Sequence, residues 1–203
     1  KIYLVTMLIS FVSVVPFIIY AEVKRKMKRV FIGCVALLLI AEIVLWGAGP
    51  HFWELIAGVQ LFFLAFNLME ALLPSLISKE SPAGYKGTAM GIYSTSQFLG
   101  VAIGGSLGGW VDGLFDSQTV FLAGALLATV WLLVAGTMKE PRYVSSLRVE
   151  IPDDVQISDA LKQRLEAKEG VTEVLIVPEE RSAYVKIDSK MTNRFEVEQA
   201  LKA

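Results

Sequence analysis

Long apolar runs separated by short polar segments fill the first two thirds of the chain. The runs cover residues 2–21, 30–47, 52–77, 87–110 and 118–138. Each is long enough to cross the roughly 30 Å hydrocarbon core of a bilayer as an α-helix. The pattern predicts an all-α bundle of five transmembrane helices within residues 1–142, with the lipid bilayer as its surroundings.

The pattern changes after residue 143 to short alternating segments. Leu147, Val149 and Ile151 alternate with polar residues, which indicates a half-buried strand. An amphipathic helix ended by Gly170, two further strands and a helix capped by Asn193 are expected to follow. The order βαββα predicts that residues 143–203 form a small α+β domain of ferredoxin-like fold without its last strand.

Composition and charge support this division and give the orientation. The chain is 54% hydrophobic, whereas residues 143–203 mix 9 Lys/Arg with 12 Asp/Glu, a net charge of −3. Basic residues gather in the segment 24–29, at positions 79 and 86, and at positions 139 and 142, while the two alternate loops have none. Since basic loops stay in the cytoplasm, the domain at residues 143–203 is expected there too.

The fourth run, from Gly87 to Gly113, contains eight glycines at helical spacing. Two adjacent ladders can be traced along it, Ser96, Gly100, Gly104 and Gly108, and beside them Gly105, Gly109 and Gly113. Small residues in register let a second helix approach closely. The ladders predict a packing surface, either a static helix contact or a moving contact used in gating.

Acidic residues within apolar runs are functional candidates, because a charge in the bilayer centre costs about 3 kcal/mol or more. Glu54 and Asp112 lie near run ends, where water is available, whereas Glu42 lies well inside the second run. Glu70 shares a face with Gln60 and Asn67, within roughly 80° around the helix. We interpret Glu70, Asn67 and Gln60 as a proton and substrate pathway; a structural carboxylate is the alternative.

Three segments resemble the drug:proton antiporters of the major facilitator superfamily. They read NLMEALLPSL at 67–76, SPAGYKGTAMG at 81–91 and GVAIGG at 100–105. The resemblance implies that the runs are helices eight to twelve and that a missing N-terminal half of the same protein is their partner. The loop at 20–29 departs from the superfamily's Gly–Asp–Arg–Gly–Arg–Arg signature and keeps only its basic residues.

This resemblance implies a multi-pass protein of the bacterial inner membrane that exports a small molecule or drug in exchange for protons. The substrate cannot be read from the residues. A proton-coupled uptake symporter, and a membrane-anchored sensor whose small domain is the output, are the alternatives.

The C-terminal domain also resembles heavy-metal-associated domains, through residues 169–177 and 183–185. Those domains carry Cys-x-x-Cys after the first strand, where this chain has Pro-Asp-Asp-Val-Gln at 152–156. We therefore expect no metal, no cofactor and no catalytic residue, and the chain has no Gly-x-x-x-x-Gly-Lys-Ser/Thr loop for phosphates. The prediction is a non-enzyme with no nucleic-acid partner and with weak self-association through the C-terminal domain.

Overall fold

The computed structural model describes residues 2–202, and side chains from residue 4 to residue 201. These residues form two compact units. Among the described residues, the first comprises 2–75 and 94–141, and the second comprises 76–93 and 142–202. The second unit thus joins the small C-terminal domain to a segment far from it in the sequence, the connection between the third and fourth predicted helices.

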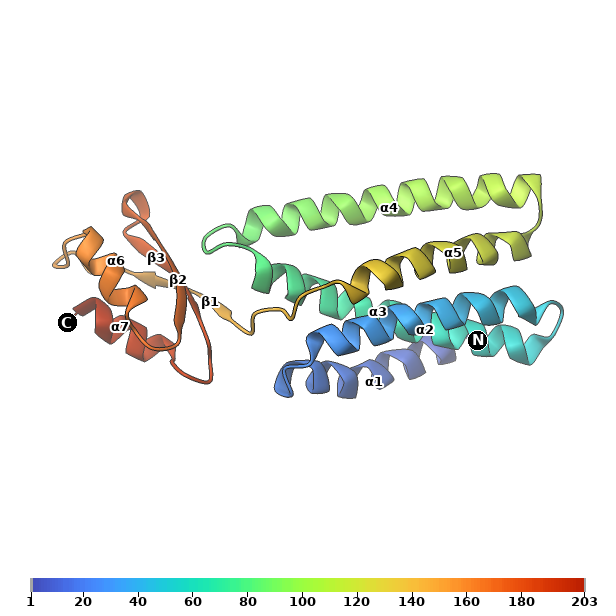
Figure 1. The fold of residues 1–203 in the computed structure, drawn as a ribbon, viewed down its shortest axis with the longest axis horizontal. Coiled ribbons are helices and arrows are strands. Elements are labelled where there is room, and N and C mark those ends of the chain that lie inside the picture. The colour runs from blue at the N-terminus through green and yellow to red at the C-terminus, as the bar shows by residue number, and fades with distance from the viewer. Residues whose placement is uncertain (1, 203) are drawn as a thin grey trace. The chain divides into compact units, whose positions relative to one another are not determined.

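Five long helices form at the positions of the five apolar runs (Figure 1). They are α1 (Ile2–Val23), α2 (Met27–Ala48), α3 (Phe52–Glu80), α4 (Lys86–Leu114) and α5 (Ser117–Gly136). Within the described residues, four of them, α1, α2, α3 and α5, are long and apolar enough to cross a membrane. The glycine-rich α4 has the length, at 29 residues, but is less apolar, so its crossing stays a prediction.

Helix ends differ from the predicted ones where charged residues continue a helix. The predicted polar loop begins at Ser78, but α3 extends to Glu80, and α4 runs on to Leu114 instead of ending at Trp110. At the end of α3, Lys79 and Glu80 are good helix formers, so polarity alone does not end this helix. The connection between α3 and α4 is therefore only residues 81–85.

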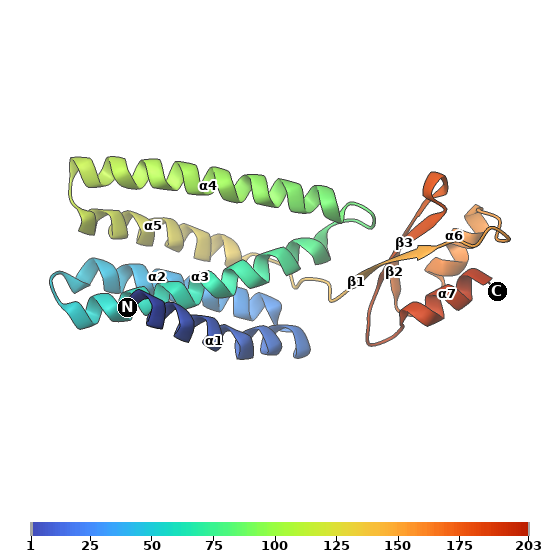
Figure 2. The ribbon, with the colours of Figure 1, turned by 180° about the vertical axis from the view of Figure 1, so that it is seen from behind.

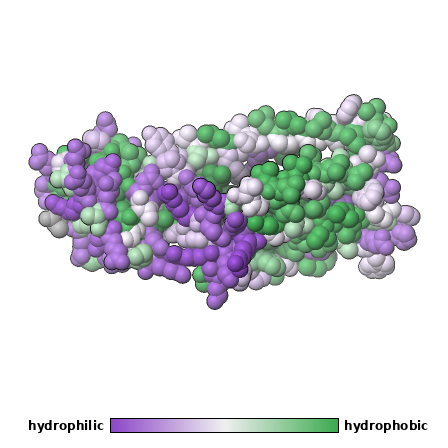
Figure 3. Space-filling view, viewed as in Figure 1, coloured by the Kyte–Doolittle hydropathy of each residue, from purple (hydrophilic) through white to green (hydrophobic). Residues whose placement is uncertain are grey.

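The α2–α5 pair is the most closely packed pair of helices in the first unit. Phe31 meets Trp131 edge to face, with ring centroids 6.0 Å apart. Farther along, Glu42 lies against Gly124, where an added Cβ would be 2.8 Å from the carboxylate oxygen Oε2. Other large apolar side chains of the helices stay exposed, for example Phe11 at 66%, and Figure 3 shows apolar surface over the helices and polar surface over the small domain. This distribution suits lipid rather than water around the helices.

The small domain has the predicted βαββα order, with a short 3₁₀ turn added (Figures 1 and 2). Its elements are β1 (Ser145–Glu150), α6 (Asp159–Glu166), β2 (Val171–Val177), η1 (Pro178–Glu180), β3 (Ser182–Ile187) and α7 (Arg194–Lys202). The antiparallel sheet has the order β1-β3-β2. The ferredoxin-like fold without its fourth strand is confirmed, and β1 is an edge strand.

Local signals place these elements as the sequence predicts. The Asn193 side chain accepts a hydrogen bond from the Glu196 N–H (3.0 Å) and caps α7. Ser158 does the same for α6 through the N–H of Leu161 (3.3 Å). Apolar residues of the strands and both helices form one core, namely Val149, Ile151, Leu161, Leu165, Val174, Ala183, Val185, Ile187, Val197 and Leu201.

Candidate functional site

The polar stripe of α3 is present, but its three members do not share a partner. Gln60 donates from Nε2 to the Ser10 hydroxyl of α1 (2.6 Å). Glu70 accepts through Oε1 from the Gln97 side chain of α4 (2.5 Å). No hydrogen bond in the described part of the chain joins the three residues to one another, so they form a line of polar positions along α3 rather than a single cluster.

Gln97, the partner of Glu70, is not among the candidate residues that the sequence predicts. It is half-buried, next to Ser96 of the glycine ladder, and its amide reaches the Glu70 carboxylate from the neighbouring helix. An amide within an apolar run is itself a signal for a functional contact. Because glycines surround Gln97 in the sequence, the pattern indicates a helix-packing surface at this position instead.

Asn67 lies between the other two polar residues of the stripe. Its Nδ2 atom is buried and has no hydrogen-bond partner among the described residues. A buried amide without a partner is unfavourable by about 1–3 kcal/mol. Asn67 therefore has a donor free for a further polar group.

The other acidic residues of the helices have separate environments. Glu54 is exposed in the first turn of α3 and lies 3.9 Å from His51. Asp112 accepts a hydrogen bond from the Ser117 hydroxyl (2.6 Å) at the turn between α4 and α5. Glu42 has no polar partner among the described residues and packs on Gly124.

The glycine ladder of α4 meets almost nothing in the described structure. A Cβ added at Gly100, Gly104, Gly105 or Gly109 would find no neighbouring atom within 4 Å, and at Gly108 it would find only Val120 Cγ1 at 3.8 Å. No residue of α4 is classed as buried. Within residues 2–202, the positions Gly100, Gly104, Gly105 and Gly109 therefore form a face of small residues against which no other helix packs.

An apolar groove opens between α1, α2 and α3 in the first unit. Its volume is about 710 Å³. Cys34 and Leu37 of α2, Phe17 of α1 and Leu68 of α3 line it, with Arg29 as its one charged residue. A groove of this size and polarity fits aliphatic or helical surface rather than a polar ligand.

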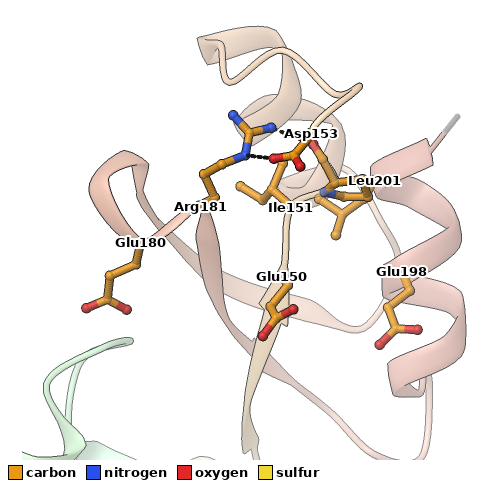
Figure 4. A pocket seen from close by; sticks show the side chains of 8 residues that line it. Glu150, Ile151, Asp153, Glu180, Arg181, Glu198 and Leu201 are labelled. Carbon is orange, nitrogen blue, oxygen red and sulfur yellow. Dashed lines mark hydrogen bonds and ion pairs between the residues drawn. The ribbon is translucent and has the colours of Figure 1, made fainter.

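An arginine side chain binds the backbone of the loop at 152–156 in the small domain. Arg181 donates from Nη2 to the carbonyl oxygens of Pro152 (2.5 Å) and Val155 (3.1 Å). Its Nε lies 3.1 Å from Asp153, and Figure 4 shows the guanidinium directed at this carboxylate. The loop that carries the metal-binding cysteines in heavy-metal-associated domains is thus held here by a side-chain cation.

A shallow pocket of about 440 Å³ surrounds Arg181. The carboxylates of Glu150, Glu180 and Glu198 also line it but do not converge (Figure 4). No group of three or more His, Cys, Asp or Glu residues suited to a metal occurs among the described residues.

Comparison with known proteins gives this domain a name. Residues 147–203 match the family model of the YajR YAM domain. Residues 147–203 are a YajR YAM domain. The whole chain is 75% identical, over 202 residues, to the C-terminal part of the inner membrane transport protein YajR of Escherichia coli strain K12. The chain spans 44% of the length of that protein.

More distant relatives extend the similarity. An uncharacterised transporter of Buchnera aphidicola subsp. Acyrthosiphon pisum is 39% identical over 51% of this chain and 27% of its own length. An uncharacterised MFS-type transporter of Pseudomonas aeruginosa strain UCBPP-PA14 is 32% identical over 53% of this chain and 26% of its own length. The names of these relatives are those of transporters, which agrees with the expectation of a non-enzyme.

Proposed function

We propose that this chain is the C-terminal part of a secondary transporter of the major facilitator superfamily in the bacterial inner membrane. The transporter exports a small molecule in exchange for protons. The whole-length similarity to YajR and the partial similarity to an MFS-type transporter support this proposal. The basic segment at 24–29 supports a cytoplasmic location for the YAM domain.

The observation that carries the proposal is the Glu70–Gln97 contact. It joins two helices through a titratable group and an amide. Ionised, Glu70 can only accept a hydrogen bond; protonated, it can also donate one. Proton binding at Glu70 therefore changes the bonding between α3 and α4, as a proton-coupled carrier requires.

The other candidate residues have supporting roles. Asn67 offers its free amide to a substrate or to a second polar group along the stripe. Gln60 ties α3 to α1. The glycine ladder of α4 and the apolar groove between α1, α2 and α3 are surfaces on which helices of the N-terminal part would pack.

Infrared titration of the complete protein tests the proton-binding role without a known substrate. The carbonyl band of a protonated carboxylic acid should rise as pH falls, and Glu70→Gln should remove one such band. Glu54→Gln, which changes a carboxylate in the first turn of the same helix, should leave that band in place. A spectrum unchanged by Glu70→Gln excludes Glu70 as the proton site.

Transport direction is tested in proteoliposomes with ethidium as a cationic probe. Under an imposed proton gradient, an antiporter moves ethidium opposite to the protons, and a symporter moves it with them. A membrane-anchored sensor would transport neither ethidium nor protons. Only the first result agrees with the proposed export.

A further inference from the structure

The YAM sheet has a second occupied face. Helices α6 and α7 cover one face, and the polar side chains of β3 and β2 point to the other. Within the second unit, Lys79 at the end of α3 and the connection at residues 81–85 lie on this other face. Ser81 is 5% exposed and Ala83 is 3% exposed, so these two residues of the connection are packed against the sheet, while Pro82, Gly84 and Tyr85 between and after them stay exposed.

Lys186 of the central strand β3 holds the end of α3. Its Nζ donates to the carbonyl oxygen of Lys79 (2.7 Å) and to that of Ser81. The last carbonyls of a helix have no intrahelical partner and carry the negative end of the helix dipole. The ammonium group therefore caps α3 from a strand more than a hundred residues further along the chain.

Two further contacts fix the connection. The Glu173 side chain of β2 accepts a hydrogen bond from the N–H of Ala83 (3.1 Å). Gly84 has a φ of +81°, and a Cβ there would lie 2.5 Å from Leu175 Cδ2. The left-handed φ favours glycine at this position, and an added Cβ would displace the Leu175 side chain of the sheet. The connection and the sheet are thus complementary in shape as well as in charge.

Both hydrogen-bond acceptors of the buried Lys186 ammonium group lie outside the YAM domain. Lysine is almost never fully buried unless it is paired, yet Lys186 is 3% exposed. Desolvation lowers its pKa, while the charges of Glu173 and Glu80 act in the opposite direction. Release of the connection would return the ammonium group to water, and its hydration would offset part of the free energy of the two hydrogen bonds that break. Such a balance suits a contact that opens and closes.

We propose that the YAM domain is a latch on the connection between α3 and α4, with Lys186 as its closing residue. The closed latch holds the ends of the two helices at one spacing. In an open latch the two helices are free to move apart. Because α3 and α4 also carry Glu70 and Gln97, the latch restrains the helix pair that the proposed transport uses, and its regulatory meaning rests on that proposed function.

Cysteine accessibility in the complete protein tests the latch. In a Cys34→Ala background, Ala83→Cys should react with a maleimide at least ten-fold more slowly than a cysteine at the exposed Glu140. Adding Lys186→Met, which keeps an apolar stem and removes the donor, should raise the reactivity of position 83 about ten-fold. Lys190→Met, a change of an exposed lysine on the same domain, should have no effect. Equal rates in Lys186→Met and its parent overturn the proposal.

A change on the other side of the contact separates release from unfolding. Gly84→Ala leaves the YAM domain unaltered and should also raise the reactivity at position 83. Gly87→Ala, where an added Cβ meets nothing within 4 Å, should not. A cysteine at the core position Ala183 should stay unreactive in every variant. If Gly84→Ala leaves position 83 protected, the latch does not exist as described.

Distances between spin labels test the restraint itself. Labels at Ser78 and Thr88, on the ends of α3 and α4, should give one narrow distance distribution, and Lys186→Met should at least double its width. An unchanged width means that the connection does not depend on Lys186. Neither the cysteine reactivities nor the spin-label distances depend on transport activity. Both can therefore confirm or exclude the latch even if the protein transports no protons.

Discussion

The carboxylate of Glu70 on α3 accepts a hydrogen bond from the amide of Gln97 on α4, over 2.5 Å. Glu70 precedes the end of α3 at Glu80 by about 15 Å of helix, and Gln97 follows the start of α4 at Lys86 by about 16 Å. The two residues therefore lie at matching positions on two helices joined by a short connection. Their contact therefore depends on how α3 and α4 pack against each other.

Glu70→Gln should abolish substrate-driven proton movement in vesicles that contain the complete protein, while expression stays intact. Glutamine keeps the size and a hydrogen-bonding oxygen for Gln97 but cannot take up a proton near neutral pH. A fluorescent pH probe inside the vesicles measures the effect, with Glu54→Gln as the matched control. Normal proton movement in Glu70→Gln would show that the coupling group lies elsewhere.

Gly104→Leu should damage the complete protein far more than Ala102→Leu. Positions 102 and 104 lie about 160° apart around α4, so only the first change enters the ladder. In the described chain both positions face open space, so the difference depends on a partner helix outside it. Membrane levels and thermal stability of the two variants measure it. Equal tolerance would make the ladder incidental.

Much of the fold could be predicted because its signals are local. The apolar runs gave the five long helices to within a few residues, and alternation at Leu147 and Val149 gave the edge strand β1. Capping by Asn193 was predicted from its spacing to Glu196 and is confirmed at 3.0 Å. These features depend on neighbours in the chain, which a sequence displays directly.

The partners of polar residues could not be predicted in the same way. Alternation along β3 puts Lys186 opposite the core, where a lysine ordinarily faces water, yet residues 79–85 cover it. Gln97 likewise reaches Glu70 only because α3 and α4 lie side by side. Both contacts depend on which segments meet in space. The line of Gln60, Asn67 and Glu70 was visible from helical spacing, but not the different partners of its members.

In a fragment of residues 142–203, which contains the YAM domain, Arg181→Met should lower the free energy of unfolding by about 1–2 kcal/mol, because two carbonyls of the 152–156 loop lose a charged donor. For a domain of this size, the melting temperature should fall by roughly 5–15 °C. Arg194→Met, which removes an exposed i, i+4 pair with Glu198, should cost less than about 0.5 kcal/mol. Calorimetry on the two variants measures both melting temperatures and tests this difference. Similar melting temperatures would mean that Arg181 does not hold the loop.

Tyr184 should ionise at a higher pH than an ordinary tyrosine. Its hydroxyl donates to Glu180 (2.9 Å), and this bond, together with desolvation and the Glu180 charge, raises its pKa above the usual 10.0. The bond's contribution to stability is complete below pH 10.0 and is lost as pH rises through the folded-state pKa. Absorbance titration of residues 142–203 should show two tyrosine steps, and Glu180→Gln should lower the later one. A single unchanged step near pH 10 would exclude the effect.

The edge strand β1 should support weak self-association of the YAM domain. In the order β1-β3-β2 one side of β1 has no neighbouring strand among the described residues, and exposed edges are used for pairing or are protected. An antiparallel copy centred on Val149 would place Arg148 opposite Glu150 of the second chain. Such a pair contributes roughly 0.2–1 kcal/mol.

Arg148 already has partners within its own chain, which keeps this association weak. Its guanidinium lies 3.3 Å from Glu180 and donates to the Ser182 hydroxyl (3.2 Å). If Arg148 exchanged these contacts for a contact with Glu150 of a second copy, the net gain in binding free energy would be small. We therefore expect dimers only at high concentration. Sedimentation of residues 143–203 over a wide concentration range measures it, and Arg148→Glu, which sets like charges opposite each other, should weaken it further. A strict monomer at millimolar concentration rules out pairing through β1.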